Sequence, residues 1–296
     1  MKLSSNFALS AYLFGLGGGW TMRKRSKPAV APPEDDKAQQ AGALVRGLSI
    51  LRAFTPADSS LGNQELIERT GLPKATISRL TYILVSLNYL LYDDQLGRYR
   101  IGPATISLGY TGLSTSAVIT MARPLMQTLA DETGLAVAMG VRDGNQMIYT
   151  ANCRSEHPVT LRLNVGSRLP IWRTAMGLAY LAGMVPTLRD AVVAGQIADE
   201  PHREADIRRL VATSLAAYER DGFVGSCGDW HSFINAVGVP FRPTDGSQLV
   251  AVTVGGIKDI APPESITGYL GPKLKVLVTD LQNRLTGRDQ AAPAAP

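Results

Sequence analysis

One short stretch of the chain holds five polar side chains that could bind a nucleic acid. They fall within nine residues and are Lys74, Thr76, Ser78, Arg79 and Tyr82. Their ammonium, hydroxyl and guanidinium groups can donate hydrogen bonds to phosphates and to base edges. A solvated helix face would show the same residue types. The neighbouring elements must therefore decide between the two interpretations.

A second cluster could do covalent chemistry, because Cys227, Asp229 and His231 lie within five residues. A thiol or carboxylate beside an imidazole is typical of a nucleophile and its base, so a hydrolase is the alternative to a binding protein. Against it, the chain has no G-x-S-x-G, H-E-x-x-H or glycine-rich phosphate motif. Its two cysteines form no C-x-x-C, and it has three histidines. We therefore expect no metal, no cofactor and no catalysis, and a reduced, cytoplasmic protein.

The elements that would position the first cluster follow one another closely. Apolar residues recur at helical spacing over 44–54 and again over 63–70, where Asn63 is expected to cap the helix. The turn Gly71-Leu72-Pro73 then leads into a third helix over 74–87. Its apolar stripe consists of Ile77, Leu80, Leu84 and Leu87.

A hairpin follows the third helix. Residues 89–92 and 98–101 have strand character and flank a turn that ends at Gly97. The spacing therefore predicts a winged helix-turn-helix over 41–102, in which the third helix reads the major groove of double-stranded DNA. Arg98 and Arg100 on the wing and Arg46 on the first helix are expected to contact phosphates.

The charge distribution favours the same interpretation. Residues 22–112 hold twelve basic and eight acidic side chains, whereas residues 113–296 hold seventeen of each. The positive excess therefore lies in the part of the chain that would contact DNA.

The apolar run Phe7–Trp20 is shorter than the roughly 20 residues of a membrane span, so no membrane association is expected. Met22 is the expected start of the protein, with a secretory signal as the alternative, and residues 1–40 and 287–296 are expected to be disordered.

The rest of the chain indicates an α+β sensor-like domain with an antiparallel sheet and flanking helices. A linker helix is expected over 103–122 and the larger domain over 123–286. Strands are expected at 135–141, 146–151, 159–163, 235–241 and 249–255, and helices at 174–184, 186–195, 204–221 and 262–285.

Seven stretches, in this order, resemble the IclR (isocitrate lyase regulator) family of bacterial regulators over residues 41–286. They are ELIERTGLPKATISRL (65–80), LGRYRIGPATISLG (96–109), ARPLMQTLADETG (122–134), GSRLPIWRTAMGLAYLAG (166–183), ERDGFVG (219–225), NAVGVPFR (235–242) and LVAVTVGG (249–256). The resemblance implies a winged helix-turn-helix, a dimerising linker helix and a GAF-like domain that binds a small-molecule effector. It also implies a homodimer or a dimer of dimers on a palindromic operator. An architectural DNA-binding protein without an effector is a further alternative.

The resemblance also implies where the effector pocket lies. The corresponding positions are Met139, Tyr149, Trp172, Arg173, Thr174, Asp229, Trp230, His231, Ala236 and Thr253. This chain has Trp172-Arg173 where many members have other residues, and Ala236 where a cysteine is frequent. The tryptophans would offer flat walls and Arg173 could pair with a carboxylate, which favours an aromatic or other organic acid. Alternatively, Trp172 and Phe233 pack in the core and Arg173 holds Asp229 or a carbonyl.

Overall fold

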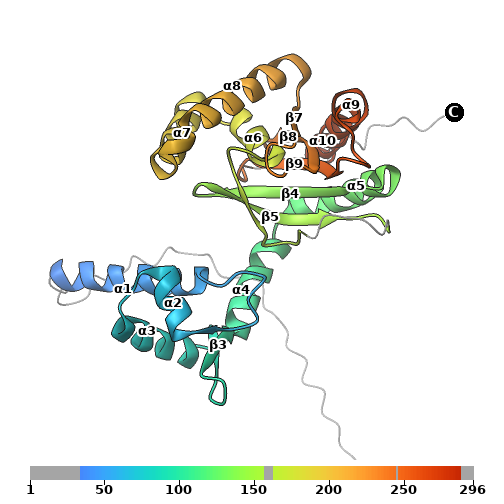
Figure 1. Ribbon diagram of the computed structural model, residues 1–296. Helices are drawn as coiled ribbons and strands as arrows, with labels where there is room; N and C mark the ends of the chain where they lie inside the picture. Colours follow the sequence, from blue (N-terminus) through green and yellow to red (C-terminus); the bar gives the residue numbers. More distant parts are fainter. Residues whose placement is uncertain (1–33, 157–162, 245, 288–296) are drawn as a thin grey trace, which may run out of the picture. The chain divides into compact units, whose positions relative to one another are not determined.

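The computed structural model of the chain describes residues 34–156, 163–244 and 246–287 (Figure 1). Helix α1 (Glu34–Arg52) is its first element. The expected disordered arm over 1–40 is therefore wrong for residues 34–40, while residues 1–33 lie outside the described part, as does the tail from 288. Acidic residues directly after two prolines are a helix-start signal in the sequence, and this signal was missed.

The expected winged helix-turn-helix is present. Helices α2 (Asn63–Thr70) and α3 (Lys74–Ser86) are joined by a turn in which Gly71 has a φ of 68°, a conformation that favours glycine. Strands β1 (Leu61–Gly62), β2 (Leu90–Asp93) and β3 (Arg98–Ile101) form an antiparallel sheet in the order β1-β3-β2. One buried cluster joins these elements and comprises Ile50, Leu61, Leu66, Ile77, Leu80, Leu90 and Tyr99.

The start of α2 differs from expectation. Asn63 is the first helical residue rather than the cap, because Gly62 is still paired with Arg98 in the sheet. The side chain of Glu65 instead reaches back, and its Oε2 accepts a hydrogen bond from the Gly62 amide at 2.7 Å. A glutamate at the third helical position is half of a capping box, so this helix start is satisfied without Asn63.

The expected linker helix over 103–122 is two helices, α4 (Pro103–Ser114) and α5 (Ala117–Thr133). Ser116 caps α5, since its hydroxyl accepts from the Ile119 amide at 3.3 Å. Val118, Ile119 and Ala122 are already buried in the core of the larger domain. That domain therefore begins near residue 117 rather than 123.

The larger domain is built on one six-stranded antiparallel sheet in the order β6-β5-β4-β9-β8-β7. Its strands are β4 (Ala136–Asp143), β5 (Gln146–Cys153), β6 (Arg168–Pro170), β7 (Val224–Cys227), β8 (Ile234–Phe241) and β9 (Val250–Ile257). Both expected hairpins, β4–β5 and β8–β9, are confirmed. The short edge strands β6 and β7 were not predicted, and the strand expected at 159–163 lies almost entirely outside the described residues.

Helices cover both faces of this sheet. On one face lie α5 and α10 (Gly271–Leu285), which follows α9 (Pro263–Ser265) and the π-helical segment Ile266–Leu270. On the other lie α6 (Ala175–Ala182) and then α7 (Pro186–Asp199), a 3₁₀ turn Pro201–Arg203 and α8 (Glu204–Asp221) (Figure 1). Helix α6 packs directly on β8, because a Cβ on Gly238 would lie 2.6 Å from the Ala175 carbonyl oxygen.

A β-bulge in β5 decides which side chains face which helices. Met139 pairs with Ala151 and Gly140 with Tyr149, so Thr150 is the extra residue, and its hydroxyl donates to the Met139 carbonyl at 3.2 Å. Before the bulge, Tyr149 faces the α6 side, while after it Ala151 faces the α5 and α10 side. Strand β5 therefore contributes side chains to both cores. Among the described residues, no helix is long and apolar enough to cross a membrane.

Candidate functional site

The polar face predicted for residues 74–82 lies on α3, whose opposite side is anchored in the core. Ile77, Leu80 and Thr81 are buried there, and the Thr81 hydroxyl donates to the Ile77 carbonyl at 2.9 Å. The outward side chains are Lys74, Ser78, Arg79 and Tyr82, with Thr76 half-buried beside them. Within the described residues, no hydrogen bond or ion pair engages the Lys74 or Arg79 side chain. Their charged groups are therefore available to a ligand.

The two wing arginines are held differently. Arg98 donates to Ser60 Oγ at 2.8 Å and to the Ser60 carbonyl at 2.9 Å, and it pairs with Glu65 Oε2 at 2.8 Å. Arg100 has one acidic partner, Asp93 at 2.7 Å, and its side chain is 51% exposed. Arg46 on α1 is exposed. The structure thus leaves Arg46 and Arg100 exposed, with Arg100 in one ion pair, but commits most donors of Arg98.

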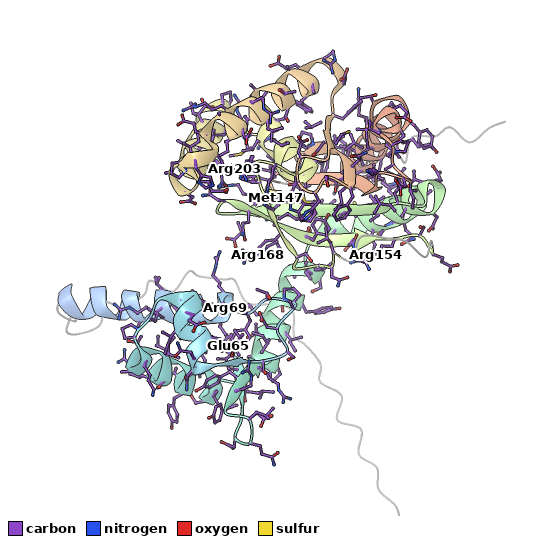
Figure 2. The ribbon with its side chains drawn as sticks, viewed as in Figure 1. Glu65, Arg69, Met147, Arg154, Arg168 and Arg203 are labelled. Atoms are coloured by element: carbon purple, nitrogen blue, oxygen red, sulfur yellow. The ribbon has the colours of Figure 1, made fainter. Side chains whose placement is uncertain are left out.

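Two ion pairs that the sequence did not reveal fasten α2 within this domain. The Gly62 amide and the Arg98 guanidinium hold the pKa of the Glu65 carboxyl below its usual value. The Arg69 guanidinium donates two hydrogen bonds to the Asp58 carboxylate, at 2.6 and 2.9 Å. These bonds strongly lower the pKa of the Asp58 carboxyl. Figure 2 labels Glu65 and Arg69. These pairs orient the helix that precedes α3.

A small pocket lies between the sheet and α6 in the larger domain. It encloses about 40 Å³ and includes five of the ten positions predicted for an effector. These five are Tyr149, Thr174, Trp230, Ala236 and Thr253. The sequence did not point to Leu163, Leu169, Ala175, Met176 and Ile234, which complete the lining together with Ser226.

The other five predicted positions lie outside this lining. Met139 is buried on the opposite face of the sheet, with α5 and α10. Trp172 is a core residue, 4% exposed, whose indole nitrogen donates to Glu200 Oε1 at 3.1 Å. Arg173 lies over the Trp172 ring, with 5.6 Å between its guanidinium carbon and the ring centroid. Asp229 accepts from Ser226 Oγ at 2.9 Å, and His231 stacks on Phe233 at 5.6 Å between ring centroids.

The pocket is polar without being charged. Four hydroxyl groups, from Tyr149, Thr174, Ser226 and Thr253, line it together with apolar side chains, and no ionisable lysine, arginine or carboxylate does. Burial raises the pKa of the Tyr149 phenol to about 12, against a smaller opposing effect of its hydrogen bond with Thr253. The phenol therefore stays protonated at physiological pH and can donate a hydrogen bond.

The three residues of the alternative hydrolase site do not form a catalytic arrangement in the described structure. No hydrogen bond joins Cys227, Asp229 and His231 in the described structure. Burial and the nearby Asp229 carboxylate raise the pKa of the Cys227 thiol, which is the opposite of what activates a nucleophile. The described residues also contain no group of three metal-ligating side chains.

Comparisons with known proteins agree with this geometry. The family model "IclR helix-turn-helix domain" matches residues 43–94, and "Bacterial transcriptional regulator IclR C-terminal" matches residues 111–275. The HTH-type transcriptional regulator TsaQ1/TsaQ2 of Comamonas testosteroni is 31% identical over 254 residues, which cover 83% of this chain and 91% of that protein. The Pca regulon regulatory protein of Pseudomonas putida is 25% identical and covers 72% of this chain and 73% of its own.

Solved structures show the same architecture. An IclR family transcriptional regulator from Brucella abortus superposes with a TM-score of 0.76 at 36% identity, covering 86% of this chain and 97% of its own. An IclR homologue from Microbacterium hydrocarbonoxydans, solved in complex with 4-hydroxybenzoate, has the same fold with a TM-score of 0.61 at 20% identity, over 84% of this chain and 100% of its own. With a helix-turn-helix whose outer face is free, a separate α+β domain that holds a pocket and two matching family models, the chain belongs to the IclR family of DNA-binding transcriptional regulators.

Proposed function

We propose that the outward face of α3 reads operator DNA and that the pocket under Trp230 binds the small molecule that modulates this reading. The observation that supports the first part is a row of free donors on a helix anchored by Ile77, Leu80 and Thr81. A rigidly held helix can place its side chains on base edges with little loss of conformational entropy. Arg46 and Arg100 would add contacts to phosphates, which position the protein without selecting a sequence.

The effector that suits this pocket is a compact aromatic molecule with one or two oxygen substituents. The walls of Trp230, Leu169 and Met176 are apolar, and the hydroxyls of Tyr149, Ser226 and Thr253 can meet polar substituents. A solved relative is complexed with 4-hydroxybenzoate, which supports aromatic acids as the first compounds to test. Because Arg173 is not part of the lining, we expect the hydroxyl groups rather than a guanidinium to hold the ligand.

Ligand entry requires one wall of the pocket to move. A volume of about 40 Å³ is close to that of a single water molecule, far below the roughly 300 Å³ or more of typical ligand pockets. Trp230 is the wall best placed to move, since it lies in the segment between β7 and β8, where His231 and Phe233 are exposed. The described state is then the closed one, and effector binding selects an open one.

A homodimer would complete the DNA-binding unit, with α4 as its contact. None of the residues of α4 is buried, and Ile106, Leu108 and Tyr110 are each more than 60% exposed. A helix with this much exposed apolar surface favours a second copy. Two copies related by a twofold axis would present two α3 helices to a palindromic site.

The experiment that tests the pocket is a thermal-shift screen of aromatic acids, phenols and aliphatic acids, followed by operator-binding assays with the compounds that stabilise the protein. Tyr149→Phe should weaken the response to an active compound by about tenfold, since one buried hydrogen bond is lost. Tyr180→Phe is the matched control, because Tyr180 is equally buried in the same core but does not line the pocket. An equal response of both variants and the unchanged protein would place the effector elsewhere.

A further inference from the structure

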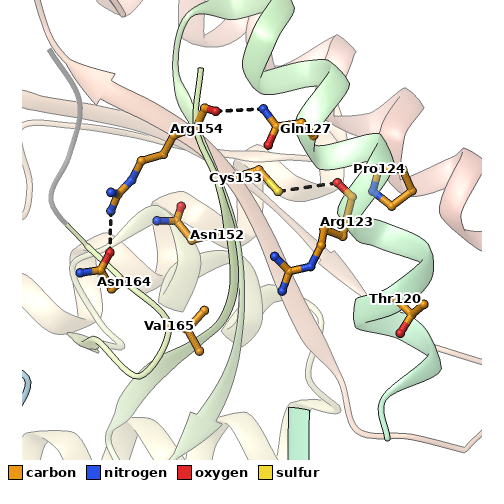
Figure 3. A pocket seen from close by; sticks show the side chains of 9 residues that line it. All are labelled: Thr120, Arg123, Pro124, Gln127, Asn152, Cys153, Arg154, Asn164 and Val165. Atoms are coloured by element: carbon orange, nitrogen blue, oxygen red, sulfur yellow. Dashed lines mark hydrogen bonds between the residues drawn. The ribbon is translucent and has the colours of Figure 1, made fainter. Parts of the chain in front are cut away.

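A second cavity, of about 590 Å³, lies on the larger domain between α5 and the outer edge of β5 (Figure 3). It is called here the Arg123–Arg154 cleft and is lined by Thr120, Arg123 and Gln127 of α5, by Asn152 and Arg154, and by Asn164. None of these residues lines the pocket proposed for the effector. Strand β6 pairs with β5 at residues 146–148, and Asn164 and Val165, which precede β6, also line the cleft.

The cleft carries positive charge without a carboxylate in its lining. Figure 3 shows the Arg123 side chain extending from α5 toward the strand that bears Asn152 and Arg154. Within the described residues, no hydrogen bond or ion pair engages the Arg123 guanidinium. Asp131, further along α5, is already engaged by Gln127 Nε2 at 2.8 Å. The Arg154 guanidinium is turned toward Asn164, so Arg123 supplies the free guanidinium group of the cleft, and such a group is suited to an oxyanion (Figure 3).

Two buried polar atoms in the lining also lack a partner among the described residues, Asn152 Oδ1 and Arg154 Nε. The Asn152 amide nitrogen donates to the Leu163 carbonyl, which fixes the amide so that its oxygen remains an acceptor. The unpartnered guanidinium N–H is a donor for an anion, and the unpartnered carbonyl oxygen needs an O–H or N–H. A buried polar group without a partner is costly, so a ligand that satisfies both would gain affinity from each.

These contacts also connect the cleft with the effector pocket. Arg154 and Asn152 both donate to the carbonyl oxygen of Leu163, and Leu163 lines that pocket. Arg154 further donates to Asn164 Oδ1 at 3.1 Å. A ligand that draws Arg154 or Asn152 toward the cleft must therefore change how the Leu163 wall is held.

We propose that the Arg123–Arg154 cleft binds a small hydroxycarboxylate anion and that its binding is coupled to the effector pocket through Leu163. The carboxylate is held by Arg123 and by the unpartnered Nε–H of Arg154, and the hydroxyl donates to Asn152 Oδ1. The coupling rests on the pocket proposed above, whereas binding in the cleft does not. If the two sites are coupled, each ligand changes the affinity of the other by the same factor.

Isothermal titration calorimetry of the full chain with malate, at constant ionic strength, tests the cleft. Arg123→Gln should weaken malate binding about tenfold or more, because a charge-assisted hydrogen bond is lost. Arg209→Gln on α8 is the matched control, an exposed arginine outside the cleft that should bind malate as the unchanged protein does. Succinate, which lacks the hydroxyl, should bind several-fold more weakly than malate.

Malate binding that is absent, or that weakens equally in both arginine variants, overturns the site. Equal affinities for succinate and malate overturn the role of Asn152. Amide hydrogen exchange tests the coupling, and malate should slow or speed exchange at residues 163–169 in the unchanged protein but not in Arg123→Gln. Exchange there that does not respond to bound malate overturns the link through Leu163 while leaving the site itself intact.

Discussion

Among single residues, Arg79 on α3 is the side chain whose loss should be most informative about sequence recognition. It is exposed and follows Ser78 on a helix that is anchored from behind by Ile77 and Leu80. If it forms a two-pronged contact with a guanine, Arg79→Ala should cost roughly 1–3 kcal/mol at the operator and far less on random DNA. Fluorescence anisotropy on both DNAs measures this, with Arg209→Ala as the control. An equal loss on both would show that Arg79 contacts a phosphate instead.

The two wing arginines should separate into different roles, although the sequence predicted the same role for both. Arg100→Ala should weaken binding to all DNA sequences alike and lower the slope of log affinity against log salt by about 1. Arg98→Ala should instead lower the melting temperature, because its guanidinium holds Ser60 and Glu65 together. Salt titrations and thermal unfolding of both variants make the comparison. If Arg98→Ala leaves the melting temperature unchanged and lowers the salt slope, then Arg98 contacts phosphates, as the sequence predicted.

Helix α4 carries exposed apolar side chains that do not pack against the rest of the described chain. Its exposed Ile106, Leu108 and Tyr110 have no buried partner in the described structure, and we attribute this surface to a second copy. The double substitution Ile106→Asp and Tyr110→Asp should therefore convert a dimer to monomers, since an interface does not tolerate unpaired buried charges. Light scattering after size-exclusion chromatography measures the mass.

The matched control for α4 is Leu188→Asp on α7, where the leucine is 60% exposed and thus comparable with Ile106. It should leave the mass unchanged. A mass that stays dimeric in the α4 variant, or that falls in the α7 variant as well, would show that α4 does not carry the contact.

For the whole molecule, paired carboxylates predict a loss of stability in acid. Hydrogen bonds from Arg69 lower the pKa of Asp58, the Gly62 amide and Arg98 lower that of Glu65, and Arg220 lowers that of Asp221. In the unfolded chain these groups titrate near pH 4, so the folded state binds fewer protons there. Their contribution to the free energy of unfolding is full above about pH 5 and is lost as the pH falls through the lower, folded pKa values.

Urea unfolding between pH 7 and pH 3 tests this expectation with Asp58→Asn. The variant should be less stable at pH 7 and should lose less stability on acidification than the unchanged protein. Asp94→Asn is the control, because Asp94 is an exposed carboxylate outside every ion pair of the described structure. Parallel pH profiles for Asp58→Asn and the unchanged protein would contradict the assignment.

Local signals in the sequence determined the helix-turn-helix, the wing and both hairpins of the larger domain. Gly71 in the turn, the apolar spacing of Ile77 and Leu80, and the turn before Gln146 act over a few residues, so their consequences are readable without the fold. The same short motifs carried the family resemblance and therefore the regulatory function. The outward face of α3 followed directly from this periodicity.

Only the tertiary structure decided which side chains share a site, because those contacts join residues far apart in the chain. Arg98 binds Glu65 across 33 residues, and Trp172 binds Glu200 across 28, so neither commitment is visible in local spacing. The extra residue at Thr150 puts Ala151 on the face of α5 and α10, although Tyr149, two residues earlier, faces the pocket. A bulge shifts the alternation of a strand by one residue, and an alternating pattern read from the sequence cannot include that shift until the register of the neighbouring strand is known.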